Sequence, residues 1–175
     1  MKPFNGALFT LLLVSIAFAA CKKKTEYTTD PNGLPKASQT GAMIFACKID
    51  GANWISNKKT FSIGGGTDNE IIAVHGSNDS GTSGYFEVLE IQVNNATTGV
   101  AYTLDGTTAN FATYTTGKKC SSSQGTTRIK STSGTVTFTR IDRTNRIISG
   151  TFSTQFSTDN CGDIKITGGR FDERF

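Results

Sequence analysis

The sequence predicts an all-β fold, an antiparallel β-sandwich of about nine or ten strands, and three observations favour it. Thr and Ser together make up 42 of the 175 residues, and Gly adds 19, which favours strands joined by tight turns over a helical bundle. Apolar and polar residues alternate along much of the chain, whereas no long helical pattern occurs. Short strand-like runs are separated by turn residues throughout. A lipocalin-like β-barrel, built from the same kind of strands, is the alternative.

The alternation locates the strands, because successive side chains of a strand point to opposite faces. In the clearest run, 148–157, Ile and Phe side chains share one face and Ser and Gln side chains share the other. Residues 42–49 are almost continuously apolar, which predicts a strand covered on both faces. Glu87 and Glu90 fall on both parities of the run 85–93, so we expect a bulge or a partly exposed face there. The expected strands are 42–49, 71–75, 85–93, 100–104, 111–114, 135–141, 148–157 and 163–167.

The first 20 residues have the features of a secretory signal peptide. Lys2 precedes an apolar stretch from Ala7 to Ala20, which as an α-helix would span about 21 Å, less than the roughly 30 Å hydrocarbon core of a bilayer. A cleaved signal is therefore favoured over a transmembrane anchor. Residues 18–21, Phe-Ala-Ala-Cys, resemble the lipobox of bacterial lipoproteins, and we expect Cys21 to be lipidated and to hold the protein at a membrane. An ordinary signal peptide with a cysteine near its cleavage site is the alternative.

Residues 21–40 are expected to form the lipidated cysteine and a flexible tether, and residues 41–175 a single β-domain. The tether has no hydrophobic periodicity and holds two of the three prolines. Lys22, Lys23 and Lys24 either contact anionic headgroups or simply keep the start of the tether solvated. Together with Lys2 they account for the whole formal net charge of +4, so the domain has no basic stripe and no nucleic-acid partner is expected.

Four motifs carry a family resemblance. Residues 48–54 read Lys-Ile-Asp-Gly-Ala-Asn-Trp, residues 133–138 Ser-Gly-Thr-Val-Thr-Phe, residues 148–152 Ile-Ser-Gly-Thr-Phe, and residues 164–172 Ile-Lys-Ile-Thr-Gly-Gly-Arg-Phe-Asp. In this order they resemble the K-x-D-G-x-x-W opening, the central strand, the I-S-G-T-F hairpin and the closing I-x-I-T-x-G-x-F-D of a family of small lipoproteins from Bacteroidetes. The family is a domain of unknown function, so the resemblance implies a lipoprotein with a β-domain and supplies no catalytic residue.

Several motif residues have structural interpretations. We expect Gly51 to take the turn after Asp50, and Trp54 to pack over the edge of the sheet. Gly150 lies on the inward parity of its strand, where a glycine admits a close-packed aromatic ring or a bend. Phe171 is expected to close the core.

The four cysteines predict one internal disulfide. Cys21 is assigned to the lipid, and Cys120 and Cys161 lie in polar, loop-like contexts, so we expect these two to pair. The bridge would close a loop of about 41 residues, worth roughly 4 kcal/mol in the chain-entropy description. Cys47 shares its parity with apolar neighbours and is expected to be a buried free thiol. A nucleophilic cysteine would need a base, and the only histidine, His75, lies at the end of an expected strand, so a Cys–His pair is disfavoured.

No metal site and no cofactor are expected. One histidine and scattered thiols do not have the spacing of a zinc site, and the oxygen-rich segments 67–70 and 77–80 do not match a calcium loop. Neither a Gly-x-Ser-x-Gly elbow nor a phosphate-binding glycine loop is present.

These observations lead to three hypotheses for function. The first is a non-enzymatic, lipid-anchored β-domain that serves as a binding or structural module in the bacterial envelope. The second is a carbohydrate-binding accessory of a glycan-uptake system, with Trp54, Tyr85, Tyr102 and Tyr114 as candidate residues for stacking on a sugar. The third is a small hydrolase, for which two of six carboxylates would have to meet in one pocket. The six are Asp68, Glu70, Glu87, Glu90, Asp163 and Asp172.

The residues after Cys21 also bear on location. Lys22 stands where an aspartate retains many lipoproteins at the inner membrane, so we expect the outer membrane. The basic residues that follow do not resemble surface-export signals, which favours an orientation toward the periplasm over the cell surface. The expected partners are the membrane, through the lipid, and a glycan or an envelope protein.

Overall fold

Ten antiparallel strands form one continuous sheet in the part of the chain that the structure describes. The structure, a computed structural model, describes residues 28–64, 69–79, 86–117, 127–158 and 162–175. The strand order is β2-β1-β10-β9-β8-β7-β5-β4-β3, and β6 pairs with β8. The strands are β1 Ile44–Ile49, β2 Ala52–Ile55, β3 Lys58–Gly64, β4 Ile71–Asp79, β5 Phe86–Asn94, β6 Ala101–Thr103, β7 Phe111–Thr116, β8 Thr127–Asp142, β9 Ile147–Thr158 and β10 Gly162–Arg174. The predicted all-β antiparallel fold is confirmed.

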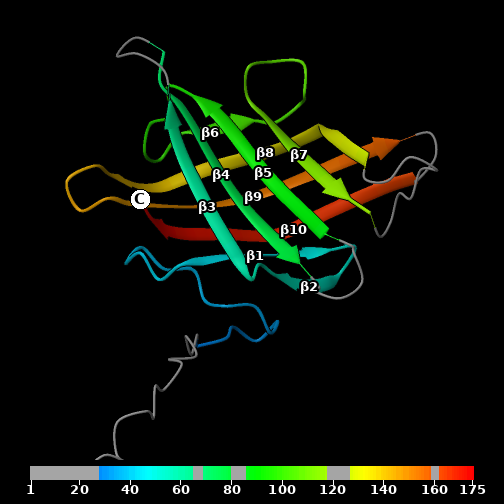
Figure 1. The fold of residues 1–175 in the computed structure, drawn as a ribbon, viewed down its shortest axis with the longest axis horizontal. Helices are drawn as coiled ribbons and strands as arrows, with labels where there is room; N and C mark the ends of the chain where they lie inside the picture. The colour runs from blue at the N-terminus through cyan, green and yellow to red at the C-terminus, as the bar shows by residue number, and fades with distance from the viewer. Residues whose placement is uncertain (1–27, 65–68, 80–85, 118–126, 159–161) are drawn as a thin grey trace, which may run out of the picture.

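The sheet curls on itself instead of lying flat. In Figure 1, β3, β4 and β5 pass across β8, β9 and β10, so the two halves of one sheet face each other. Register shifts interrupt the pairing of β8 with β9, of β10 with β9 and of β1 with β10. Such β-bulges bend strands and increase their twist, which allows long strands to curl. The result is a half-barrel, intermediate between the predicted sandwich and its barrel alternative.

The two ends of the sheet meet where the chain passes from β2 to β3. These strands stand at opposite ends of the strand order, yet only Ser56 and Asn57 connect them. Ser56 is buried, and its hydroxyl donates to the carbonyl of Ser77 in β4 at 2.9 Å. Gly76 of β4 leaves room for the ring of Phe45 in β1, because a Cβ at position 76 would lie 2.6 Å from that ring. Strands β1 and β4 therefore close the core across the seam.

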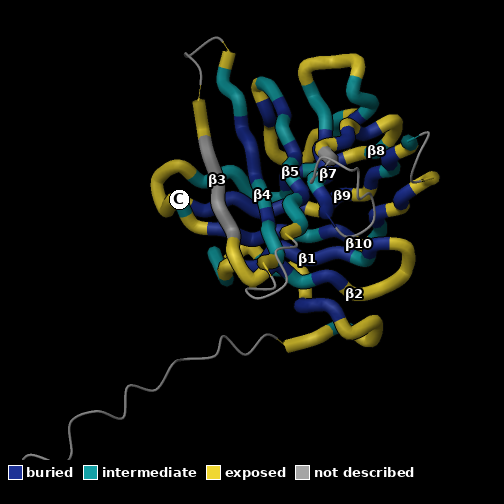
Figure 2. Tube along the Cα trace, turned by 45° about the vertical axis from the view of Figure 1, so that its right-hand side comes forward, coloured by how far each residue is buried: buried dark blue, intermediate teal, exposed yellow. Residues whose placement is uncertain are grey.

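The main core fills the space enclosed by the curled sheet (Figure 2). Its aromatic centre consists of Phe45, Phe138, Phe152 and Phe171, whose rings make tilted, stacked and edge-to-face contacts. Phe171 is 1% exposed and closes the core as expected. The interpretation of Gly150 is confirmed, because a Cβ there would collide with the ring of Phe171 and lie 2.6 Å from the carbonyl oxygen of Thr137.

The folded body begins earlier than expected, which corrects the assignment of residues 28–40 to the flexible tether. We call residues 28–42 the N-terminal brace, because this segment packs against the outer faces of β1 and β10 (Figure 1). Leu34 is 1% exposed and joins Ile44 and Ala46 in a second, smaller core. The expectation that β1 is covered on both faces is confirmed, since Phe45 and Cys47 face the main core and Ile44 and Ala46 face the brace.

Three charged residues of β10 hold the brace, namely Asp172, Arg170 and Arg174. Arg174 donates to the carbonyls of Thr40 and Gly41. The buried carboxylate of Asp172 accepts hydrogen bonds from five donors, namely the hydroxyls of Ser38 and Ser149 and the backbone N–H groups of Thr40, Gly41 and Ala42. Arg170 donates to the carboxylate of Asp30 at 2.8 Å and to the carbonyl of Pro35 at 2.9 Å. The segment lacks a hydrophobic period, and polar contacts from β10 position it in place of a repeated apolar face.

The remaining sequence predictions agree with the strands in part. The eight expected runs all fall on strands, and Asp50 and Gly51 form the predicted turn between β1 and β2 with φ of 49° and 83°, values typical of a type I′ hairpin. Strands β2 and β3 and the first half of β8 were not predicted. Of the two alternatives expected for the run 85–93, the partly exposed face is observed, since buried and partly exposed residues alternate along β5, and no bulge occurs in its pairing with β4 and β7 in the described residues.

Candidate functional site

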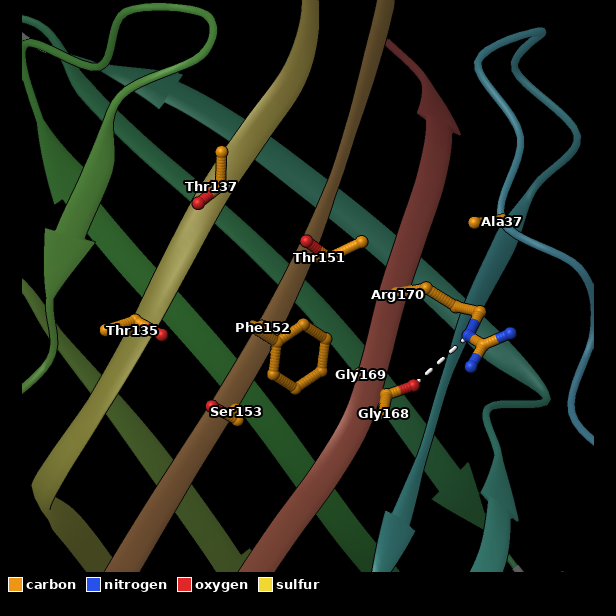
Figure 3. A pocket seen from close by; sticks show the side chains of 9 residues that line it. All are labelled: Ala37, Thr135, Thr137, Thr151, Phe152, Ser153, Gly168, Gly169 and Arg170. Atoms are coloured by element: carbon orange, nitrogen blue, oxygen red, sulfur yellow. Dashed lines mark hydrogen bonds between the residues drawn. The ribbon is translucent and has the colours of Figure 1, made fainter. Parts of the chain in front are cut away.

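A shallow groove crosses the outer face of β8, β9 and β10 beside the brace (Figure 3). It has a volume of about 370 Å³. Ala37 of the brace forms one wall, and the floor carries the outward side chains of β8 and β9. A smaller hollow of about 210 Å³ continues from it past Ser153 toward Gln155 and Lys165. Together they form an open, elongated depression on the face opposite the main core.

Four hydroxyl side chains form a two-by-two array on the floor of the groove. Thr135 of β8 stands opposite Ser153 of β9, and Thr137 stands opposite Thr151 (Figure 3). Opposed side chains on paired strands are about 5 Å apart, and successive side chains on one face of a strand are about 7 Å apart. Within the described residues, none of the four hydroxyls has a side-chain hydrogen-bond partner. The array therefore presents donors and acceptors that are available to a ligand or to water.

The one arginine of the groove is already neutralised. Arg170 points toward Ala37 in Figure 3, its Nε donates to the carbonyl of Gly168 at 3.1 Å, and its guanidinium pairs with Asp30. Both partners of this ion pair are mostly buried, with 14% and 17% of their side chains exposed. The floor thus carries hydroxyls without an uncompensated charge, an arrangement suited to a neutral, polar ligand.

A second polar cluster lies on the inward side, between β1–β2 and β5–β7. The carboxylate of Glu87 accepts hydrogen bonds from Trp54 Nε1 at 3.1 Å and from the hydroxyl of Tyr114. Burial and the hydrogen bond to Glu87 raise the pKa of Tyr114 above its usual range, so the phenol stays protonated and acts as a donor. Burial, with a contribution from Glu87, also raises the pKa of Cys47 to about 12. The cluster satisfies a carboxylate inside the sheet and holds Cys47 as an unreactive thiol.

The expected state of Cys47 is confirmed, because it is buried and free. His75 lies on the opposite face of its strand from the buried Ile72 and Val74. There its ring contacts the carboxylate of Glu90 at 3.3 Å, and Arg128 binds the same carboxylate at 3.0 Å. Cys47 faces the core and His75 faces outward, so the two do not form a nucleophile–base pair.

The predicted aromatic platform is wrong for two of its four members. Trp54 and Tyr114 are buried in the main core with 6% and 0% exposure, because inward parity on β2 and β7 directs both rings to the interior. Tyr102 packs against Phe138, and its hydroxyl binds the backbone of Asn95 and Thr97. Tyr85 lies outside the described residues. Stacking of a sugar on Trp54 and Tyr114 is therefore excluded in this fold.

Within the described residues, each candidate carboxylate has its own partners, and none of them lines the groove or the smaller hollow. No group of three described His, Cys, Asp or Glu side chains could hold a metal ion. Glu70 pairs with Arg143, and Asp163 accepts from Gln155 and Ser157. Asp68 lies outside the described residues, as do Cys21 and the expected disulfide partners Cys120 and Cys161.

Sequence reasoning did not single out the groove residues. Their signal was present in the outward parity of the runs 135–141 and 148–157, where Thr and Ser repeat at every second position. Outward hydroxyls are common on a solvated sheet face, so the pattern alone could not distinguish a groove from an ordinary surface. The brace, which supplies one wall, was assigned to the tether.

A comparison with protein families finds a match over most of the domain. A model of the family described as "Domain of unknown function (DUF6252)" matches residues 42–173. No curated protein and no solved structure matches the chain. Among the residues that the structure describes, no helix is long and apolar enough to cross a membrane.

Proposed function

The chain belongs to the DUF6252 family, whose function is unknown, and we propose that it is a lipid-anchored, non-catalytic β-domain that serves as a binding or structural module in the bacterial envelope. The observation that carries this proposal is the lipobox-like Phe-Ala-Ala-Cys at 18–21, at the end of an apolar stretch and separated by six residues from the start of the folded body at Thr28. We place the protein at the outer membrane because Lys22 stands where an aspartate retains many lipoproteins at the inner membrane. We orient it toward the periplasm because the basic residues after Cys21 do not resemble surface-export signals.

The energetics of acylation support a stable anchor. Each buried CH₂ contributes about 0.8 kcal/mol, and one acyl chain alone gives only reversible binding, whereas several chains together hold a protein firmly.

The non-catalytic part of the proposal is supported by the described polar groups. Their carboxylates are engaged by separate partners, and the Cys47 thiol is held in its protonated form.

Metabolic labelling tests the anchor directly. The full chain is produced in a bacterium that processes lipoproteins and is fed an alkyne fatty acid. The product is then analysed by detergent phase partitioning and by intact-mass spectrometry. We expect the label, the detergent phase and a mass that begins at an acylated Cys21. Cys21→Ser should abolish all three, whereas Cys47→Ala, which removes a buried thiol, should keep them. An unacylated amino terminus in the unaltered chain would refute the anchor.

A second candidate function, binding of a neutral glycan, is favoured by the groove instead of by aromatic stacking. The four hydroxyls of the array are free to bond to sugar hydroxyls, and the pairing of Arg170 with Asp30 leaves the groove around the array without an uncompensated charge, while the exposed Lys165 lies in the smaller hollow beyond it. Phe152 also lines the groove but is only 5% exposed, so the groove offers modest affinity, since much of the apolar contact of a sugar face is missing.

Glycan-array screening of the Cys21→Ser chain tests this second candidate. The double variant Thr137→Val/Thr151→Val keeps the strand-forming shape of both side chains and removes two hydroxyls of the array. It should lower binding by roughly tenfold if each hydroxyl contributes about 0.7 kcal/mol. Thr144→Val, in the exposed turn between β8 and β9, is the matched control and should bind normally. Equal binding by both variants would exclude the groove.

A further inference from the structure

The brace leaves only a short link between the folded body and the lipid. The brace begins at Thr28, so six residues, 22–27, separate it from Cys21. From Cys21 to Thr28 a chain of this length can reach at most about 25 Å. A compact body of about 150 residues has a diameter of roughly 40 Å. The link is therefore shorter than the body that it holds, and the anchored body cannot turn freely over the membrane.

The point of attachment is fixed to one side of the body. The backbone N–H of Lys36 donates to the carbonyl of Thr28 at 2.9 Å, and Asn53 of β2 donates to the carbonyl of Asn32 at 3.1 Å. In Figures 1 and 2 the brace lies beside β1 and β2 at one end of the molecule. The connection between β6 and β7, residues 104–110, lies at the opposite end in both views.

We propose that the surface formed by the brace and β2 is the membrane-facing surface of the protein, and that the β6–β7 connection points away from the bilayer. This orientation rests on the proposed lipid anchor. The partner is a lipid bilayer with anionic headgroups, because the exposed Lys36 lies beside Thr28 and Lys22, Lys23 and Lys24 precede it in the link. The groove wall formed by Ala37 belongs to the same brace, so a ligand of the groove would bind close to the membrane side.

Energy transfer to the membrane tests the orientation. A coumarin amino acid replaces either Asn32 in the brace or Ala109 in the β6–β7 connection, both exposed, in the full acylated chain. The chain is bound to phosphatidylethanolamine–phosphatidylglycerol vesicles that contain a rhodamine-headgroup lipid. We expect transfer from position 32 to be at least about twofold higher than from position 109, given a body of roughly 40 Å.

A spacer variant separates the short link from any affinity of the surface itself. Twenty Gly and Ser residues inserted between Lys24 and Thr25 raise the average span of the link to about 29 Å, so the difference between the two positions should shrink. A difference that survives the spacer would contradict the short link as its cause. If the unaltered chain floats with the vesicles but energy transfer is equal from positions 32 and 109, the orientation is wrong while the lipid anchor stands. Loss of flotation would overturn the lipid anchor and, with it, the orientation.

Discussion

Asp172 shows how one carboxylate joins two parts of the chain that are far apart in sequence. It lies on the outer face of β10, next to Ser149 of β9, and accepts hydrogen bonds from three consecutive backbone N–H groups of the brace. Burial alone would raise its pKa, but the hydrogen bonds from Ser38, Ala42, Ser149 and Gly41 outweigh burial and lower the pKa below the ordinary value. The ionised form is therefore the one that stabilises the fold.

Replacement of this carboxylate should weaken the protein and change its response to acid. A folded-state pKa below the unfolded value stabilises the protein above the unfolded pKa of about 3.9, and this contribution is lost as the pH falls through the folded pKa. We expect Asp172→Asn to lower the free energy of unfolding at pH 7 by about 1–3 kcal/mol. Below about pH 4 the variant should lose less of its remaining stability than the unaltered protein does, because it has no carboxylate to protonate at this position. Urea titrations at several pH values, followed by circular dichroism, measure both effects.

The matched control is Asp163→Asn, which changes an exposed carboxylate on the same strand. Its partners Gln155 and Ser157 lie at the surface, so the free energy of unfolding should change by less than about 1 kcal/mol. Equal effects of the two substitutions would show that Asp172 does not hold the brace in the way that its hydrogen bonds indicate.

Gly150 tests the packing of the core. A methyl group there would collide with Phe171 and the backbone of Thr137, so Gly150→Ala should cost about 1–3 kcal/mol despite the better strand propensity of alanine. Gly64→Ala is the control, because a Cβ at position 64 would meet no atom within 4 Å. Its stability should equal or slightly exceed that of the unaltered protein. Thermal unfolding by calorimetry distinguishes the two, and an unchanged melting temperature for Gly150→Ala would contradict this packing.

At the scale of elements, periodic strands were predictable and the segments that cover them were not. Strand β9 alternates cleanly because one face meets the aromatic core and the other meets solvent, which gives a period of two. The buried apolar residues of the brace are Leu34 and Pro35, which are adjacent in the sequence. Two adjacent residues set no period, and contacts with β10, more than a hundred residues away in sequence, determine the place of the brace.

In the candidate site, too, the residues on periodic strands were predictable and the parts placed by distant contacts were not. The position of Thr137 on an outer face could be read from its parity, but the groove needs the brace as a wall and Arg170 paired with Asp30. Trp54 packs inward from β2 at the end of the sheet, in line with its expected packing, and only its alternative role in sugar stacking is wrong. Strand β2 is only four residues long, too short for a period, and the hydrogen bond from Trp54 to Glu87 depends on the curl that brings β2 close to β5.

Leu34 provides the test of the brace as a structural element. Leu34→Ala removes its contact with Ile44 and Ala46 and should cost about 2–4 kcal/mol. Lys36→Ala, two residues away and exposed, should change the free energy of unfolding by less than about 0.5 kcal/mol. Hydrogen exchange should also show faster exchange at the amides of Thr40, Gly41 and Ala42 in Leu34→Ala. Unchanged exchange and stability would indicate that the brace is dispensable for the fold.

At the scale of the whole molecule, the sheet is held closed by contacts between its two ends. Ser56 binds Ser77 across the seam, and the ring of Phe45 rests against Gly76. Most strand pairs of the described sheet join strands that are close in sequence, whereas β1 pairs with β10 and the brace contacts β10 from the far end of the chain. We expect the meeting of β1 and the brace with β10 to be the slow part of folding, because only these distant segments must find each other.

The predicted disulfide between Cys120 and Cys161 would cross one end of this sheet. Both residues lie outside the described ranges, but the strands that flank them, β7–β8 and β9–β10, pair at their adjoining ends through Thr116 with Thr127 and Thr158 with Gly162. These ends belong to the same end of the sheet, because β8 and β9 run antiparallel. A bridge there would close a loop of about 41 residues and add roughly 4 kcal/mol of stability.

Thiol counting with a maleimide-polyethylene glycol reagent on the exported Cys21→Ser chain tests the bridge. The folded protein should not react, because Cys47 is buried and burial raises its pKa to about 12. In urea it should gain one adduct, at Cys47, and in urea after reduction three adducts. Cys47→Ala should gain none in urea until it is reduced. Three adducts in urea without reductant would show that the two cysteines are free, and the fold would then be held closed by the seam and the brace alone.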